Sequence, residues 1–457
     1  MNNGNASAMS KRVGERLYRT VRDNLPMVLL VGGNVLLGFA FNWGLAYAGS
    51  SAPWSSDGLI FQSYVEGGEI VGFCLMAIAA ATGTSLAGSC VAAGVGMVVG
   101  MAGMLSPIGV FANGGSAVFG CGYAMLLTEY LTAASRLVPR KTLSVIAVIL
   151  VSAFISFPLT TELDSAGGSL YAIAATAGSV LCLLMAAEAL PPLAKALGKG
   201  VAGPLVAHKR LVAFAIGVPL AYGFCTSYLA IGPSSFGFAV GYMIPGVVVL
   251  AGLVLFYNRF SLLTVYAIGY PMMVLGLLLS FFLGLPSFWA KVLISASLSS
   301  AYILIYMMAR LCGRTEAAFT FSYAVLTLLI TLFVTIGKEV GSFFVPLEID
   351  SAVAVALVMI AVLSFGLVMP RTQGAETPDV NDPLFDASMR HDALTLAHEH
   401  GLSERETAVY VLLVSGKGIG DISEELFIAP STVRAHASRI YEKFGVHDRE
   451  GLAAASR

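Results

Sequence analysis

Long apolar runs separated by short polar connections occupy most of the first 370 positions of the chain. Each run is close to the length of about 20 residues that a helix needs to cross a lipid bilayer. The boundary between the second and third runs rests only on a weak polar break at residues 82–88. The pattern predicts an all-α protein with twelve membrane-spanning helices, at residues 26–48, 66–86, 88–108, 114–134, 142–160, 168–190, 211–231, 236–257, 262–284, 287–309, 317–337 and 350–369.

The longest internal connection, at about residues 191–210, divides the twelve predicted spans into two groups of six. Major facilitator transporters are built from two six-helix halves, and residues 26–370 resemble them in this layout. Two features separate the chain from that superfamily. The two groups of spans are not related by a sequence repeat. Such transporters usually carry an Asp- and Arg-rich loop between spans two and three, and here Thr82, Gly83, Thr84 and Ser85 stand in its place.

Composition and charge support the membrane assignment and orient it. The chain is 57% hydrophobic and 12% charged, whereas soluble domains carry roughly 25% charged residues. Basic residues gather in alternate connections, which by the positive-inside rule places these connections and both termini in the cytoplasm. The basic segment 1–25 precedes the first span, and Lys291 and Lys338 are the only basic residues expected outside.

The segment at residues 371–400 is polar and acidic, and it predicts a linker that ends in a short helix, Asp386 to His400, capped by Gly401. His391, His398 and His400 do not share one helical face, so we expect no metal site. The six cysteines lie in apolar runs without a C-x-x-C pair. The sequence contains no nucleophile elbow, P-loop or zinc-protease motif. We expect no cofactor and no enzymatic activity.

Polar and apolar positions in residues 401–457 follow the spacing of short helices and predict a small cytoplasmic four-helix domain. Ser403 and Glu406 form an S-x-x-E capping box, in which each side chain bonds the free backbone N–H of the other. A second short helix is predicted at about residues 421–426. Pro430 suits the first position of a third helix, and Gly445 suits its end.

The third helix of this domain is amphipathic. Its predicted buried stripe consists of Val433, Ala437, Ile440 and Phe444. The opposite face and its flanks carry Ser431, Thr432, Arg434, Ala435, His436, Ser438, Arg439 and Lys443. An arginine among small residues, flanked by hydrogen-bond donors, suits the major groove of double-stranded DNA. A small bundle that binds another protein fits the helical spacing equally well.

A resemblance favours DNA. The segment is similar to the helix-turn-helix of LuxR-type transcriptional regulators, at Leu402, Ser403, Arg405, Glu406, Gly416, Ile422, Leu426, Ile428, Thr432, Val433, Arg434, His436, Ile440, Lys443, Gly445, Val446 and Arg449. The resemblance implies that Arg434, Ala435 and Ser438 face bases, and that Thr432 and His436 lie near phosphate. Two positions depart from the family: Ala429 replaces the usual N-cap serine, and Ser438 replaces a residue that is often basic.

The charge of this domain predicts weak DNA binding by one copy. Residues 401–457 contain seven basic and eight acidic residues, unlike the basic surface of a strong autonomous DNA-binding domain. Two copies held side by side gain effective concentration, so we expect a homodimer on DNA. The family resemblance places the dimer contact after Asp448, with Leu452 as its apolar residue.

Ionisable and amide side chains inside the predicted spans are candidates for a ligand site, because such residues are costly in a membrane. They are Asn34, Asn42, Glu66, Glu69 and Lys291. Together they predict a small polar or anionic ligand, with Lys291 as counter-charge. The alternative is that Glu66, Glu69 and Lys291 lie at the ends of spans and reach interfacial water.

These observations lead to one main functional hypothesis and one alternative. Twelve spans followed by this domain resemble the membrane-embedded LuxR-family regulators of anaerobic gut bacteria. The chain is therefore predicted to be a one-component transcription regulator that senses a small molecule through its membrane domain. The alternative is a major-facilitator-like transporter with a regulatory DNA-binding tail.

Overall fold

The structure is a computed structural model that describes most of the membrane region and most of the C-terminal domain. The described residues are 24–45, 58–82, 89–137, 165–190, 209–228, 236–255, 262–283, 288–312, 316–344, 396–397, 400–414, 418–426, 428–446, 448 and 451–452. All regular structure in these ranges is helical. The chain divides into two compact units, residues 1–371 and 372–457.

Ten of the twelve predicted spans coincide with helices, and the other two, 142–160 and 350–369, lie outside the described residues. The ten helices are Asn24–Leu45, α2 (Gly58–Thr82), α3 (Ser89–Met104), α4 (Gly109–Ser135), α6 (Ser165–Ala189), α8 (Lys209–Tyr228), α9 (Phe236–Leu255), α10 (Leu262–Leu283), α11 (Phe288–Cys312) and α12 (Glu316–Phe344). Six of the described helices are long and apolar enough to cross a membrane, and four more are shorter apolar helices.

Two helix bounds differ from the prediction in an informative way. The second span was expected to begin at residue 66, but α2 begins at Gly58; the eleventh was expected to end at residue 337, but α12 continues to Phe344. A hydropathy window stops at a charged residue, and Glu66 and Lys338 stand at these two places. The prediction that Lys338 lies in an outside connection is wrong, because this residue is inside α12.

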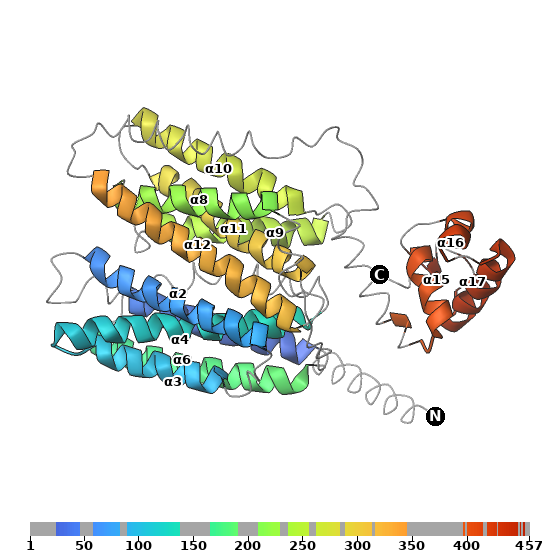
Figure 1. Ribbon diagram of the computed structural model, residues 1–457, viewed down its shortest axis with the longest axis horizontal. Coiled ribbons are helices and arrows are strands. Elements are labelled where there is room, and N and C mark those ends of the chain that lie inside the picture. The colour runs from blue at the N-terminus through green and yellow to red at the C-terminus, as the bar shows by residue number, and fades with distance from the viewer. Residues whose placement is uncertain are drawn as a thin grey trace, which may run out of the picture. The chain divides into compact units, whose positions relative to one another are not determined.

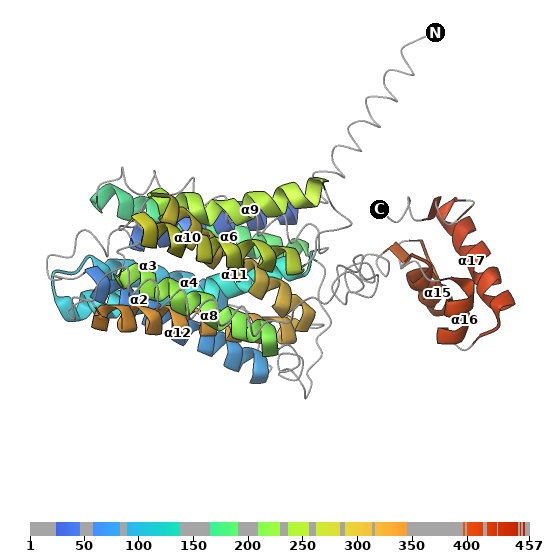
Figure 2. The same ribbon diagram turned by 90° about the horizontal axis from the view of Figure 1, so that it is seen from above.

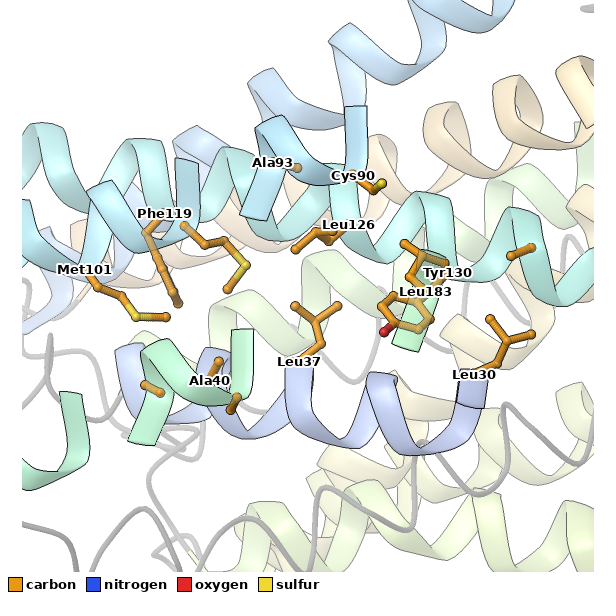
Figure 3. Packing of buried hydrophobic residues seen from close by; sticks show 14 of the residues in the cluster. Leu30, Leu37, Ala40, Cys90, Ala93, Met101, Phe119, Leu126, Tyr130 and Leu183 are labelled. Carbon is orange, nitrogen blue, oxygen red and sulfur yellow. The ribbon is translucent and has the colours of Figure 1, made fainter. Parts of the chain in front are cut away.

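The first four described helices and α6 form one group (Figure 1). Helices α2 and α3 both pack against α4, and α3 also packs against α6. Leu30 and Leu37 of the first helix, Phe119 and Leu126 of α4, and Leu183 of α6 point into one core (Figure 3). Lipid tails are as apolar as these side chains, so close packing rather than removal from water stabilises the core.

Glycines permit this close packing where helices cross. A Cβ added to Gly100 of α3 would lie 2.7 Å from the carbonyl oxygen of Gly115 in α4, so only glycine fits there. Gly100 of the predicted third span thus brings two helices together, as small residues do in membrane proteins.

Helices α8 to α12 form the second group (Figures 1 and 2). Within it, α8 packs along α12, and α11 packs against both α9 and α10. The most extensive contact between the two groups is made by α2 and α12. A hydrogen bond of 3.0 Å between the hydroxyls of Thr132 in α4 and Thr320 in α12 also joins the groups. Helix α12 is therefore the main described connection from the second group to the first.

The C-terminal unit has a hydrophobic core of its own. It contains α15 (Glu404–Val414), α16 (Ile419–Leu426) and α17 (Pro430–Phe444). Val409 and Tyr410 of α15 and Ile422 of α16 pack against Val433 and Ile440 of α17. Burying each such aliphatic side chain stabilises a water-soluble domain by about 1.5–3 kcal/mol. The predicted second helix, about residues 421–426, begins slightly earlier, at Ile419.

Candidate nucleic-acid interface and intramembrane polar cluster

Helix α17 begins and ends as its sequence predicts. Pro430 occupies the first turn, where its missing N–H costs nothing. Ala429 is the N-cap residue and makes no side-chain cap hydrogen bond. At the other end Gly445 adopts a left-handed conformation, with φ of 66°, and Val446 donates its N–H to Tyr441 O at 2.9 Å. The N-terminal end of the helix is thus less well capped than the C-terminal end.

The predicted buried stripe of α17 is confirmed, and this determines which side chains face outward. Val433, Ala437, Ile440 and Phe444 are buried. Six predicted DNA-contacting residues are exposed: Thr432, Arg434, Ala435, Ser438, Arg439 and Lys443. Neither Arg434 nor Arg439 forms a hydrogen bond or ion pair with another residue in the described part of the chain. Both residues are exposed on the outward face of α17.

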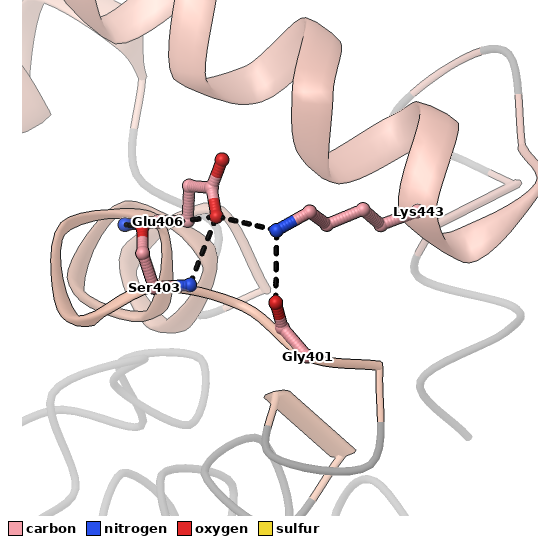
Figure 4. A network of polar contacts seen from close by, with 4 residues as sticks. All are labelled: Gly401, Ser403, Glu406 and Lys443. Atoms are coloured by element: carbon pink, nitrogen blue, oxygen red, sulfur yellow. Dashed lines mark hydrogen bonds and ion pairs between the residues drawn. The ribbon is translucent and has the colours of Figure 1, made fainter.

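His436 and Lys443 differ from the other members of this set. His436 is half-buried, and its Nδ1 is buried without a hydrogen-bond partner in the structure. Lys443 donates from Nζ to Gly401 O and to Glu406 Oε2, each at 2.8 Å (Figure 4). The Lys443 ammonium therefore has two partners within its own domain, and its predicted contact with phosphate stays a prediction.

The capping box predicted at the start of α15 is confirmed, and Lys443 extends it. Ser403 donates its backbone N–H to Glu406 Oε2 at 2.9 Å, and its hydroxyl donates to the same oxygen at 2.9 Å. The Lys443 ammonium, followed by these donors of Ser403, lowers the pKa of Glu406 to about 2. One carboxylate thus joins the start of α15 to the last turn of α17.

The segment before α15 is tied to the same end of α17. Gly401 has φ of 62°, and Leu402 donates its N–H to Ala397 O at 2.8 Å, which confirms the predicted glycine cap. The His400 ring stacks on Phe444, with ring centroids 4.0 Å apart. These contacts, with the Lys443 bonds, hold the C-terminal end of α17 in place within the unit.

In the membrane unit, Glu66 forms an ion pair with Lys338 that connects α2 to α12. The second carboxylate oxygen of Glu66 accepts a hydrogen bond from the Thr335 hydroxyl at 2.9 Å. Glu66 and Lys338 are only 8% and 7% exposed. Glu66 lies eight residues after the start of α2, and its carboxylate is paired within the bundle.

The other predicted ligand residues are spread over the unit. Glu69 lies one turn beyond Glu66 on α2 and is half-buried. Asn34 is buried on the first helix. Asn42, on the same helix, is half-buried and has an interaction partner. Lys291 is half-buried in the first turn of α11, near a helix end. Lys338, not Lys291, is the cation that acts on Glu69.

The sequence of residues 400–455 matches the family of bacterial regulatory proteins named for luxR. The three helices and their packing agree with this match. The C-terminal unit is a luxR-type helix-turn-helix domain. It is 47% identical over 53 residues to a probable transcriptional regulatory protein, NarL, of Mycobacterium tuberculosis, and 46% identical over 48 residues to the spore germination protein GerE of Bacillus subtilis. These matches cover 12% and 10% of the chain, and 24% and 65% of the two relatives.

Solved transporter structures share the fold of the remaining part of the chain. The human organic anion transporter MFSD10 is 14% identical with a TM-score of 0.51, and covers 75% of this chain and 98% of its own. The outward-conformation transporter FucP is 15% identical with a TM-score of 0.51, covering 76% and 99%. PepTSo is 12% identical with a TM-score of 0.52, covering 75% and 97%. The membrane unit therefore has a major-facilitator-like fold.

The luxR-type domain also corrects one expectation about dimers. Leu452 was expected to be an apolar contact between two copies, but it is 1% exposed and belongs to the core of a single domain. Its backbone N–H donates to Asp448 O at 3.0 Å, which places it in a helical turn that folds back onto that core. A dimer contact in this region would need other side chains.

Sequence reasoning missed Lys338 and the tyrosines around Glu69. Tyr123, Tyr242, Tyr302 and Tyr323 lie within electrostatic range of Glu69 and come from four helices, α4, α9, α11 and α12. A tyrosine in a membrane span carries no signal of its own, because its ring is apolar. Lys338 had a signal: small residues continue at Gly337 and Gly341, so the helix face extends past the charge.

Proposed function

We propose that the chain is a membrane-bound one-component transcription regulator. Its membrane unit senses a small molecule, and its luxR-type domain binds double-stranded DNA. The observation that carries the proposal is the outward face of α17, where Arg434 and Arg439 have no partner among the described residues, on a chain that also has a major-facilitator-like fold. The similarity to NarL, a probable transcriptional regulatory protein, supports the same role.

On DNA, α17 would lie in the major groove. Arg434 would bond guanine edges, and Ala435 and Ser438 would face neighbouring bases. Thr432, His436 and Arg439 would contact phosphates and fix the position of the helix. Lys443 could add a phosphate contact only by leaving, or sharing, its bonds to Gly401 and Glu406.

A homodimer on DNA is part of the proposal. The domain carries one more acidic than basic residue, and the Lys443 charge is offset by Glu406. Few counterions would then be released by one copy. Two copies paired through their membrane units would gain roughly 10²–10⁴ in effective affinity.

For DNA to be reachable, the luxR-type domain must lie in the cytoplasm of the bacterial cell. We infer an inner-membrane location with both termini cytoplasmic from the charge asymmetry of the connections. A reporter that is active only in the periplasm, fused after Arg371, should be silent. Activity of that fusion would place the domain on the wrong side and would reject DNA binding in the cell.

A transporter with a DNA-binding tail is the second candidate function. It is favoured by the extent of the structural similarity, which spans 97–99% of transporter chains such as PepTSo and FucP. Flux of a labelled solute into proteoliposomes that contain the full chain would support it. No enzymatic reaction, metal or cofactor forms part of either proposal.

The central test is selection of random duplex DNA by the full-length protein in lipid nanodiscs, at one fixed salt concentration. We expect an enriched sequence with two related half-sites. The variant Arg434→Ala should lose part of this enrichment. The variant Arg405→Ala removes an equal charge from an exposed position of α15 and should retain the enrichment. No enrichment over empty nanodiscs would reject the proposal.

A further inference from the structure

Two carboxyl groups, Glu66 and Glu69, and one ammonium, Lys338, lie where α2 meets α12. Glu66 uses both carboxylate oxygens, one for Lys338 and one for Thr335. Glu69 lies within electrostatic range of Glu66 and Lys338, but it forms no hydrogen bond or ion pair with other described residues. Two carboxylates therefore share one ammonium. Ionisable side chains in a membrane interior are costly and mark a functional position.

Tyrosines from both groups of helices lie within electrostatic range of Glu69. We call Glu69, Tyr123, Tyr242, Tyr302 and Tyr323 the Glu69–tyrosine cluster, because the phenol group of each tyrosine interacts electrostatically with the carboxyl group. The backbone places Glu69 against α4: a Cβ on Gly120, one turn before Tyr123, would lie 3.2 Å from Glu69 N. The Tyr242 and Tyr302 rings are 6.2 Å apart at an angle of 53°. Tyr123, Tyr242 and Tyr302 are only half-buried, so part of each side chain can be reached by a small molecule.

The half-burial of Tyr302 points to accessible space inside the bundle. Among the described spans, α11 has the largest buried share, and the residues on either side of Tyr302, Ala301 and Ile303, are buried. Because these neighbours are buried, the partly accessible Tyr302 ring does not belong to a lipid-facing row of exposed residues. It faces Tyr242 of α9 and lies within electrostatic range of Glu69 and Tyr123, which belong to the first group of helices.

Asn34 is an independent observation that points to a ligand in the same region. Its side chain is 3% exposed, and its Nδ2 has no hydrogen-bond partner in the structure. Leu25 and Val28 mark the exposed side of this helix. Asn34 lies on the opposite side, seven residues and two turns from Phe41, whose ring stacks on Tyr123 with centroids 3.7 Å apart. The unpaired amide thus faces the interior that contains the cluster.

We propose that the Glu69–tyrosine cluster binds a small organic cation, which deepens the sensing role proposed above and rests on it. The carboxylate supplies the counter-charge, and the tyrosine faces attract an ammonium group by cation–π interaction. The Asn34 amide donates to an acceptor atom elsewhere on the ligand. An anionic ligand, which we expected with Lys291 as its partner, would find no cation for itself in this cluster, because Lys338 is paired with Glu66 and Lys291 does not act on Glu69.

The test measures binding to the full-length protein in nanodiscs, without DNA. The cationic probes are choline, benzyltrimethylammonium and 2-phenylethylamine. Their neutral counterparts are 3,3-dimethylbutan-1-ol and 3-phenylpropan-1-ol, and the anionic one is 3-phenylpropionate. Calorimetry and the shift of the thermal melting midpoint report binding. We expect at least one cation to bind at least tenfold more tightly than its neutral counterpart.

Variants assign this selectivity to the cluster. Glu69→Gln should weaken the cation at least tenfold and leave the neutral probes unchanged. Glu188→Gln, at an exposed position of α6, removes the same charge and should have no effect. Tyr302→Leu should weaken the cation more than Tyr302→Phe, which retains the ring. If Glu69→Gln does not give a monodisperse protein, Glu69→Asp retains the charge and should preserve selectivity for cations.

Three results would overturn the proposal: no cation binding at 10 mM, preference for the anion, or equal losses in the Glu69 and Glu188 variants. These outcomes are separate from failure of the proposed function, which is measured by DNA selection without any probe. A protein that selects DNA but binds only anions would remain a regulator with a different ligand class.

Discussion

Each unit of the chain contains a lysine–glutamate pair that joins distant parts of the sequence, but the two pairs lie in different surroundings. In the luxR-type domain, the Lys443 side chain is 36% exposed and Glu406 is 6% exposed. In the membrane unit, Lys338 and Glu66 are 9% and 10% exposed at their side chains. Water can solvate the Lys443 ammonium if the pair breaks, whereas little water reaches either member of the membrane pair.

The difference determines what each pair contributes. A pair at the surface has a median contribution of about 0–1 kcal/mol, because water screens it. A buried pair adds little relative to an apolar replacement, but removal of one partner leaves an uncompensated charge. The Glu406–Lys443 pair connects α15 to α17 within one small domain. The Glu66–Lys338 pair connects α2 to α12 across the two groups of helices. The membrane pair is therefore the more sensitive to a single substitution.

The largest expected effect is that of Lys338→Met. This change leaves the Glu66 carboxylate buried without its ammonium, at a cost of about 3–5 kcal/mol. The thermal melting midpoint of the full-length protein in nanodiscs should fall strongly. The double variant Glu66→Gln with Lys338→Met removes both charges and should recover most of that loss, since the amide can still accept a bond from Thr335.

Glu339→Gln is the control for this experiment. Glu339 is the next residue on α12 but is exposed, so its loss should change the midpoint little. If the double variant melts as low as Lys338→Met, the destabilisation arises from packing of the lysine stem and not from the unpaired charge. The contrast between the two units would then lose its electrostatic basis.

The second effect concerns Arg434 of the luxR-type domain, whose charge has no partner among the described residues. Arg434→Ala should cost about 1–3 kcal/mol of DNA affinity and relax base preference at one position. Folding should be unaffected, because Arg434 is exposed and forms no ion pair with other described residues. Equilibrium binding of the full-length variant to the selected DNA measures the loss. Unchanged affinity and base preference would mean that another face of α17 contacts DNA.

Local signals made most of the luxR-type domain predictable from sequence. The capping box at Ser403, the proline at position 430, the glycine caps and the buried stripe of α17 each depend on residues within one or two turns. Spans were predictable for a similar reason, because bilayer thickness fixes the length of an apolar run. Ten of the predicted runs coincide with described helices.

Long-range partners were not predictable. Glu66 and Lys338 are 272 residues apart, and each reads as the polar end of a span when taken alone. Sequence reasoning therefore began the second span too late, ended the eleventh too early and chose Lys291 as the counter-charge. Lys443 was read as a phosphate contact because nothing near it in sequence indicates Glu406, 37 residues away. In both units, the wrong predictions concern which acidic residue each lysine pairs with.

The third effect is that of pH on the domain pair. The folded-state pKa of Glu406 is about 2, below its ordinary value of 4.5. The ion pair therefore stabilises the domain fully above about pH 4.5, and this contribution is lost as the pH falls toward 2, where the folded carboxylate also takes up a proton. The urea midpoint of fragment 386–457 should fall over this range. The fall should be smaller in Glu406→Gln, and equal falls would contradict the assigned pKa.

Lys443→Met tests the same pair from its other side. Loss of two charge-assisted bonds from a side chain that is one-third exposed should destabilise the fragment by about 1–2 kcal/mol. A phosphate contact by Lys443 would appear separately, as a salt slope of DNA binding lower by about one unit. A lower slope without loss of stability would show that the ammonium serves DNA and not the fold.

The smallest expected effect is a gain in folding stability from Ala429→Ser, which adds a hydrogen bond but no charge. The Ala429 backbone is extended, with φ of −62° and ψ of 145°, which is the geometry of a capping residue, but its methyl group cannot accept a hydrogen bond. A serine hydroxyl there can accept from an N–H in the first turn of α17, which should add about 1 kcal/mol. Ala429→Val is the control, since valine is as poor a capping residue as alanine and offers no acceptor. The urea midpoint of the serine variant should rise equally at pH 7 and pH 3, because a hydroxyl does not titrate. A gain that disappears at low pH would show that the start of α17 depends on the Glu406–Lys443 pair at its other end, and that the domain does not divide into a neutral cap and a separate charged contact.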